Sequence, residues 1–231
     1  MTFPTAPRYD LYAGIHKALR AFMADTLVAI GRMDEGDAAD TGPALAQLRA
    51  LLGCMRAHLG HENEFIHPLL ESVAVGAAAR ISIEHVEHQR EIATLEAQVD
   101  AFEAADASAR PALALKLYRE LALFVGENFS HMQYEEVVHG AQLWAHCSDA
   151  QLLDLEHRIV ASQTPDEAML VLRWMLPYMT HAERCALLFG MRAMVPAPVF
   201  AAVLELARAH LREGDWIKLD AALSAPSLRA A

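Results

Sequence analysis

The chain contains 231 residues, 54% of them hydrophobic, and carries a formal net charge of −11. This length allows a large core in one large or two small domains, and the negative charge argues against binding to a nucleic-acid backbone. No stretch resembles a membrane span or a secretory signal, and three widely spaced cysteines fit a reducing compartment, so we expect a cytoplasmic protein.

Helical periodicity dominates the first two thirds of the chain, without any alternating strand pattern of useful length. We therefore expect an all-α fold with four long helices, at about residues 9–33, 43–72, 77–105 and 108–144. Pro68 is expected to kink or end the second helix, because proline removes a backbone hydrogen-bond donor. We assign these helices to one domain, residues 1–147.

Shorter helices are expected after Ser148. Thr164 and Thr180 are each followed three residues later by a glutamate, which is the capping-box pattern that opens a helix. Four or five short helices are expected between Ser148 and Leu223. They form a C-terminal extension, residues 148–231, to which no motif assigns a role.

A histidine followed four residues later by a glutamate occurs three times, at His58/Glu62, His67/Glu71 and His131/Glu135. At about 100° per residue, the first and third pairs fall within the apolar stripes of their helices, whereas His67 projects to the opposite side. We therefore predict that His67 and Glu71 are solvated. A buried ionised pair is costly unless it is compensated, and a metal ion is a common compensation.

Further polar residues occupy the apolar stripes of the other helices. Every predicted long helix contributes a nitrogen ligand, and two contribute a carboxylate; the candidate metal ligands are His16, His58, Glu62, His85, His88, His131 and Glu135. Imidazoles with bridging carboxylates are typical of dinuclear non-haem metal sites, where two glutamates bridge the ions and histidines bind terminally. A ferritin-like site is rejected, because the first helix contains no glutamate before Glu35.

The order His16, His58-x-x-x-Glu62, a third-helix histidine and His131-x-x-x-Glu135 resembles the hemerythrin-like HHE cation-binding domain. The resemblance covers about residues 9–145. It implies an up-down four-helix bundle with a di-iron centre that binds O2 or related small ligands. The implied cofactor is two Fe ions, oxo- or hydroxo-bridged when oxidised, although Mn and Zn accept the same ligands.

Two departures from oxygen-carrying hemerythrins concern the third and fourth helices. Those proteins use two third-helix histidines four residues apart, whereas His85 and His88 are three apart. They also use an aspartate five residues after the fourth-helix histidine, whereas Glu135 follows His131 by four. We slightly favour His88 as the third-helix ligand and keep His85 as a second ligand or a partner of one. A simple oxygen-carrier role is disfavoured.

Two functional hypotheses follow. The first is a di-iron protein that binds or senses O2, NO or peroxide, or handles iron; we favour binding over catalysis, and an enzymatic form would be a di-iron oxidoreductase. Tyr12 and Tyr134 can donate a hydrogen bond to such a ligand, but similar tyrosines are more often ordinary packing residues. The alternative is a metal-dependent regulatory or interaction protein, whose C-terminal helices engage a partner or form a homodimer. Neither nucleic acid nor membrane is an expected partner.

Overall fold

The computed structural model describes residues 8–225, and every regular element in this range is helical. The expected all-α fold is therefore confirmed. The chain divides into two compact units, Met1–Gln163 and Thr164–Ala231. No helix within residues 8–225 is long and apolar enough to cross a membrane. Most of the N-terminal segment in which we expected no secretory signal lies outside the described residues.

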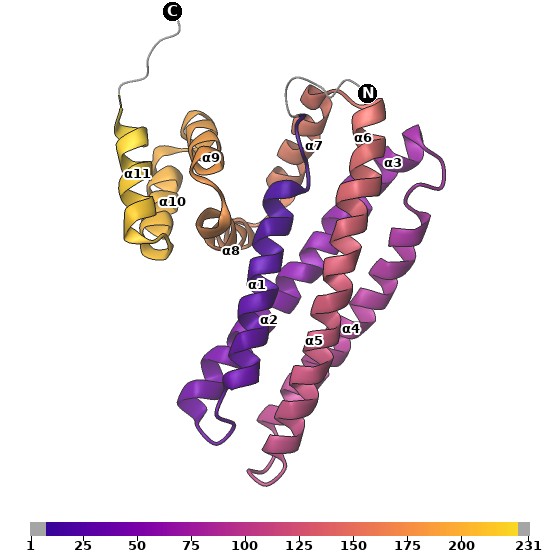
Figure 1. Cartoon of the computed structure of the whole chain (residues 1–231), viewed down its shortest axis with the longest axis vertical. Coiled ribbons are helices and arrows are strands. Elements are labelled where there is room, and N and C mark those ends of the chain that lie inside the picture. Colours follow the sequence, from indigo (N-terminus) through magenta and orange to yellow (C-terminus); the bar gives the residue numbers. More distant parts are fainter. Residues whose placement is uncertain (1–7, 226–231) are drawn as a thin grey trace, which may run out of the picture. The chain divides into compact units, whose positions relative to one another are not determined.

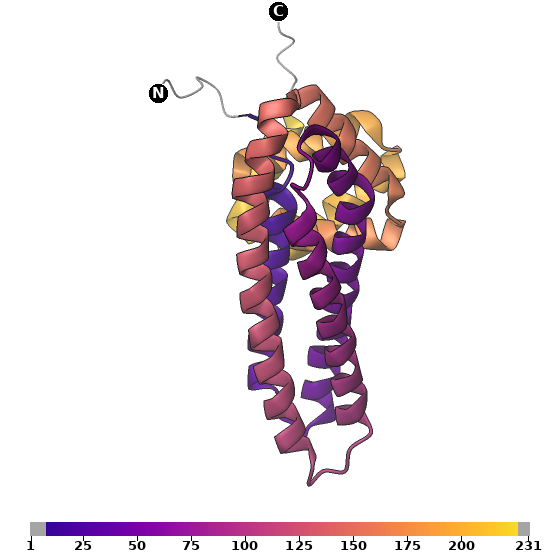
Figure 2. The same cartoon turned by 90° about the vertical axis from the view of Figure 1, so that its right-hand side faces the viewer.

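The first unit is built on four long helices, α1 (Ala13–Arg32), α2 (Ala38–His61), α4 (Ala79–Glu103) and α5 (Arg110–Tyr134). Each packs on two others, in the order α1, α2, α4, α5 and back to α1, so they enclose one core (Figure 1, Figure 2). The apolar stripes predicted from the sequence face this core. Among the fully buried side chains are Leu19, Met23, Leu48, Leu51, Met55, Leu121 and Phe124.

The second and fourth bundle helices each contain one π-helical turn. α2 continues through η1 (Glu62–Ile66) into α3 (His67–Val73), and α5 continues through η2 (Glu135–His139) into α6 (Gly140–His146). In these turns the His67 N–H donates to the Glu62 carbonyl and the Gly140 N–H to the Glu135 carbonyl. Each turn adds a residue to the helix, as π-bulges do at many functional sites. Pro68 therefore follows a bulge, and the helix continues beyond it.

The bulges change which residues face the core. His67 is only 7% exposed and His139 is fully buried. The prediction that His67 is solvated is therefore wrong, because a projection at about 100° per residue assumes an uninterrupted α-helix. Glu71 is solvated as expected, and its carboxylate accepts hydrogen bonds from the backbone N–H groups of Gly76 and Ala78.

Helix α7 (Asp149–Ser162) belongs to the first unit. Ser148 forms a capping box with Gln151 at its start. Its buried side chains pack into an apolar cluster at one end of the bundle, formed by Leu11, Tyr12, Ile66, Leu70, Leu143, Cys147, Leu152 and Leu155. We call this the end cluster. The division between the compact units thus falls after α7, whereas the sequence analysis placed the domain boundary before it.

The second unit contains α8 (Pro165–Met175), η3 (Leu176–Tyr178), α9 (His181–Met194), α10 (Ala197–His210) and α11 (Glu213–Ser224). Both predicted capping boxes are present, at Thr164 with Glu167 and at Thr180 with Glu183. The unit has its own core, formed by Leu172, Leu176, Leu188, Val203, Ala207, Leu211, Leu219 and Leu223.

A carboxyl pair between α4 and α5 gives a prediction about stability. Burial and the carboxyl group of Glu127, which hydrogen-bonds Glu91, raise the pKa of Glu91 to about 7. The folded state therefore holds a proton that the unfolded chain releases above about pH 4.5, so stability should fall as the pH rises from about 4.5 to about 7. Because the pair is partly exposed, we expect Glu91→Gln to stabilise the fold by about 1 kcal/mol at pH 8.

Urea unfolding of wild type and Glu91→Gln at pH 4 and pH 8 measures this effect. The two proteins should have similar stability at pH 4, where Glu91 is protonated in both states. Glu103→Gln is the control, because Glu103 accepts a hydrogen bond from Arg49 and its loss should not stabilise the chain. An equal effect of Glu91→Gln at both pH values would contradict the prediction.

Candidate metal centre

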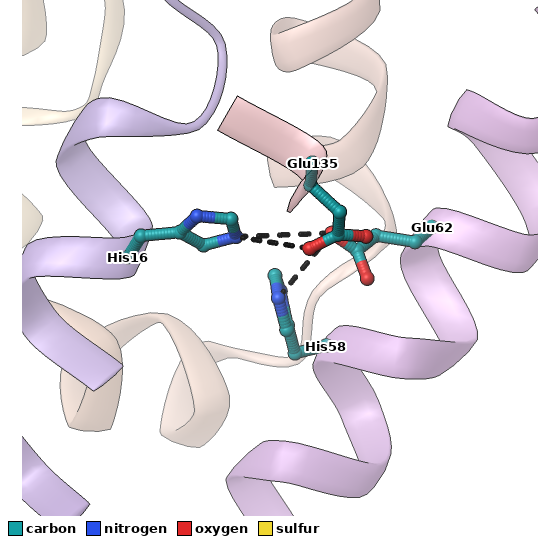
Figure 3. A group of neighbouring side chains, drawn as sticks. All are labelled: His16, His58, Glu62 and Glu135. Carbon is teal, nitrogen blue, oxygen red and sulfur yellow. Dashed lines mark ion pairs between the residues drawn. The ribbon is translucent and has the colours of Figure 1, made fainter. Parts of the chain in front are cut away.

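Six buried side chains from the four bundle helices converge on one layer of the core, which we call the ligand layer. They form two groups of potential ligand atoms, each within 4.8 Å of one another: His16, His58, Glu62 and Glu135 in the first, and Glu62, His85, His131 and Glu135 in the second. Both groups therefore share the two glutamates. Figure 3 shows the first group, with His16 and His58 directed at the carboxylates of Glu62 and Glu135.

The distances between histidine nitrogens and carboxylate oxygens fit ligands around common cations. His58 Nε2 lies 3.3 Å and His85 Nε2 3.4 Å from different oxygens of Glu62. His16 Nε2 and His131 Nε2 each lie 3.5 Å from different oxygens of Glu135. Two ligands at about 2.1 Å from one cation lie about 3.0 Å apart at a right angle and about 3.4 Å apart at the tetrahedral angle.

Several of these atoms have no hydrogen bond within the described part of the chain. They are the Nε2 atoms of His16 and His58 and all four carboxylate oxygens of Glu62 and Glu135. Leaving one such buried group unpaired costs about 1–3 kcal/mol, and more if the group is charged. Cations held by the two groups would satisfy all six atoms, so the residues fit a metal centre.

The pKa shifts of Glu135 and His58 also fit a bound cation. Burial and the neighbouring Glu62 carboxylate raise the pKa of Glu135 well above its normal value. Burial lowers the pKa of His58 to about 3, although Glu62 opposes this effect. Both shifts disfavour the charged forms of Glu135 and His58, and a divalent cation would reverse the penalty on the Glu135 carboxylate.

Comparison with known proteins identifies the family. The sequence model of the family described as "Hemerythrin HHE cation binding domain" matches residues 8–141. The chain belongs to the hemerythrin HHE family. No curated protein and no solved structure gives a significant match. The buried histidines and glutamates of this HHE domain fit the cation-binding role that the family description states.

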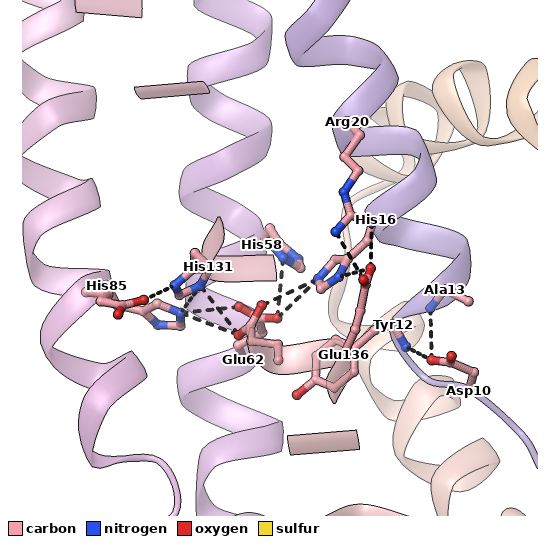
Figure 4. A network of polar contacts seen from close by, with 12 residues as sticks. Asp10, Tyr12, Ala13, His16, Arg20, His58, Glu62, His85, His131 and Glu136 are labelled. Carbon is pink, nitrogen blue, oxygen red and sulfur yellow. Dashed lines mark hydrogen bonds and ion pairs between the residues drawn. The ribbon is translucent and has the colours of Figure 1, made fainter. Parts of the chain in front are cut away.

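Charged side chains hydrogen-bond two of the HHE histidines through Nδ1, the ring nitrogen that does not face the ligand layer. His16 Nδ1 donates to Glu136 Oε1 over 3.0 Å, and Arg20 donates to both oxygens of Glu136 (Figure 4). His16 and Arg20 outweigh the effect of burial and lower the pKa of Glu136 to about 2. Since an ionised carboxylate only accepts, a proton of His16 lies on Nδ1, and Nε2 is the nitrogen left to bind a cation.

The second ligand group has a matching arrangement. His131 Nδ1 donates to Glu84 Oε2 over 2.8 Å, and Arg80 Nε donates to Glu84 Oε1 over 2.7 Å. The remaining nitrogen of His85 pairs with Asn63 Oδ1 at 2.8 Å. The sequence analysis missed Glu84, Glu136 and Asn63. The only available signal was their position next to His85, Glu135 and Glu62 in the sequence.

The two third-helix histidines of the HHE domain occupy different places. His85 belongs to the second ligand group, whereas His88 belongs to neither group found among the described residues. The His88 ring is buried and lies 4.8 Å from the His131 ring and 6.2 Å from that of Phe124. The two positions share a helix face but differ by about 4.5 Å along the axis, so only His85 is level with the glutamates.

Two further buried histidines lie beside the ligand layer. The His67 ring stacks on His85 at 4.9 Å and meets His139 edge-on at 6.1 Å. His139 Nε2 donates to the Ala77 carbonyl over 3.2 Å. His67 Nε2 and His139 Nδ1 have no hydrogen-bond partner within residues 8–225. An unbroken α-helix would leave His67 on the solvent side, so the π-helical turn after α2 is why helical projection did not find it.

Proposed function

We propose that this HHE domain holds two iron ions and binds or senses a small ligand such as O2, NO or peroxide. The observation that carries the proposal is the pair of ligand groups that share Glu62 and Glu135, because two shared carboxylates suit two adjacent cations. Group one would bind one ion through His16 and His58, and group two the other through His85 and His131. When bound, ferrous ions supply an open coordination position and electrons for such a ligand.

The chain's own residues contribute orientation and exclusion of water. Glu136 and Glu84 fix the proton of one histidine in each group, so that Nε2 faces the layer. Buried apolar side chains within one helical turn of the ligands keep bulk water away; they include Leu19, Met55, Leu59 and Met132. This exclusion would keep solvent water and protons away from a reactive bound ligand.

Optical titration tests the proposed ligand binding. Protein loaded with Fe(II) without air is mixed with O2, NO or azide, and new charge-transfer bands are expected with at least one of them. A protein that retains iron but shows no spectral change with any of the three would contradict the proposal.

A second candidate, metal-dependent regulation, is favoured by the position of Tyr12. Its ring lies 5.0 Å from that of His16, and its side chain packs in the end cluster with Leu152 and Leu155 of α7. Metal binding would fix the position of His16. Through Tyr12 it would then stabilise the packing of α7, the helix that precedes the second unit in the chain. Hydrogen exchange in α7 should then slow on metal loading; identical exchange with and without metal would contradict this role.

A further inference from the structure

The Tyr12 hydroxyl is a buried polar group that the proposed metal ligands do not use. The side chain is 1% exposed, and Oη has no hydrogen-bond partner among residues 8–225. Nearly all buried polar groups in folded proteins are hydrogen-bonded to protein, water or ligand. An unpaired hydroxyl next to a metal centre therefore suggests a partner that arrives with the loaded site.

The surroundings of Tyr12 restrict where that partner can lie. The side chain belongs to the end cluster, in which apolar side chains such as Leu11, Ile66, Leu70 and Leu143 offer the hydroxyl no acceptor. The ring also lies beside His16, one helical turn further along α1. Figure 4 shows the Tyr12 side chain extending from α1 toward the side of the site where Glu62 lies. The remaining direction for a hydrogen bond is thus the ligand layer.

The state of the hydroxyl makes it a donor. A tyrosine hydroxyl is protonated at neutral pH and can donate one hydrogen bond. The Tyr12 ring lies 5.0 Å from that of His16, so an acceptor held between the metal ions and the end cluster would lie within its reach.

The same side of the layer contains other unpaired polar atoms. His67 follows Glu62 and His139 follows Glu135 by about one turn, toward the end of the bundle that the end cluster closes. Their free nitrogens, like Tyr12 Oη, are buried and unpaired within the described range. The opposite side also has buried unpaired polar atoms, Asn128 Oδ1 and His88 Nδ1, beside apolar groups such as Leu19 and Met55. What distinguishes the Tyr12 side is an unpaired hydroxyl, which can donate a hydrogen bond to a bound ligand.

We propose that the Tyr12 hydroxyl donates a hydrogen bond to the small anionic or diatomic ligand bound at this centre, and so sets how tightly the ligand is held. The inference rests on the proposed function. It makes Tyr12 a residue that selects ligands with an acceptor lone pair over purely apolar gases of similar size.

The test compares wild type with Tyr12→Phe, using azide as the probe. Both proteins are loaded with iron, oxidised and titrated with azide while the optical spectrum is recorded. Loss of one hydrogen bond to a charged acceptor should weaken azide binding about tenfold in Tyr12→Phe. Tyr134→Phe is the matched control, because its ring packs on Arg80 and His139 rather than on a ligand histidine, and its azide affinity should be unchanged.

Two further measurements separate this inference from the proposed function. Iron content must be equal in wild type and Tyr12→Phe, and metal-free Tyr12→Phe should unfold at the same temperature as metal-free wild type or higher. Equal azide affinity at equal iron content would overturn the inference, and so would a less stable metal-free variant, which would reveal a partner within the protein. Wild type that binds no metal would instead overturn the proposed function.

Discussion

Glu135→Gln is expected to lower metal affinity more than about 100-fold, because it removes a proposed charged ligand shared by both groups, whereas loss of an outer partner costs about 10–100-fold. The fold should survive this change. Burial and Glu62 raise the pKa of Glu135, so the metal-free protein already disfavours its charged form. Metal-free stability should therefore change by less than about 1 kcal/mol.

Isothermal titration with Mn(II) or Zn(II) measures the affinity, and thermal unfolding followed by circular dichroism measures the fold. Glu71→Gln is the control, since Glu71 also follows a histidine by four residues but only caps the Gly76 turn from the surface. Metal binding by Glu135→Gln at wild-type affinity would show that the shared carboxylate is not a ligand.

Glu136→Gln is expected to weaken metal binding about 10–100-fold, although Glu136 belongs to neither ligand group. Its ionised carboxylate fixes the Nδ1 proton of His16 and is itself held by Arg20. A neutral amide would no longer enforce this arrangement or increase the basicity of Nε2. Because His16 belongs only to the first group, the weaker binding should affect one of two ions.

The expected result is therefore two separated binding steps in the variant, where wild type binds two ions over a narrower range of concentration. Glu96→Gln is the matched control: Glu96 also accepts a hydrogen bond from an arginine, Arg56, but pairs with no proposed ligand. A uniform loss of both ions, or no change at all, would contradict the assigned role of Glu136.

Much of the bundle follows from the sequence because its helices have regular apolar stripes. Leu117, Leu121 and Phe124 on α5 repeat at three- and four-residue spacing and are all buried, as the pattern predicts. The same spacing places His131 and Glu135 inside. The resemblance to the HHE family rests on these residues, and the family match confirms it.

The π-helical turns limited what helical projection could predict. Each begins at a shared glutamate, and every residue beyond it is rotated by one extra position. His67 consequently turns inward, although an unbroken helix would leave it in solvent. Pro68 disfavours a regular α-helical bond pattern, but proline more commonly marks a kink or an end than a bulge.

Helical projection also does not give the position of a residue along the helix axis relative to residues on neighbouring helices. His85 and His88 both lie on the buried face of α4, so periodicity cannot separate them. Their relation to Glu62 and Glu135 depends on how α4 is shifted along its axis against α2 and α5. That shift is fixed by packing between helices and by the loop lengths, which single-helix patterns do not contain.

The number of metal ions per chain tests the central claim most directly. Purified protein is loaded with Fe(II) without air, freed of excess metal by gel filtration, and analysed for iron and protein concentration. We predict about two irons per chain, bound through the two ligand groups that share Glu62 and Glu135. Folded protein that retains no iron, or that saturates at one ion per chain, would contradict a dinuclear centre.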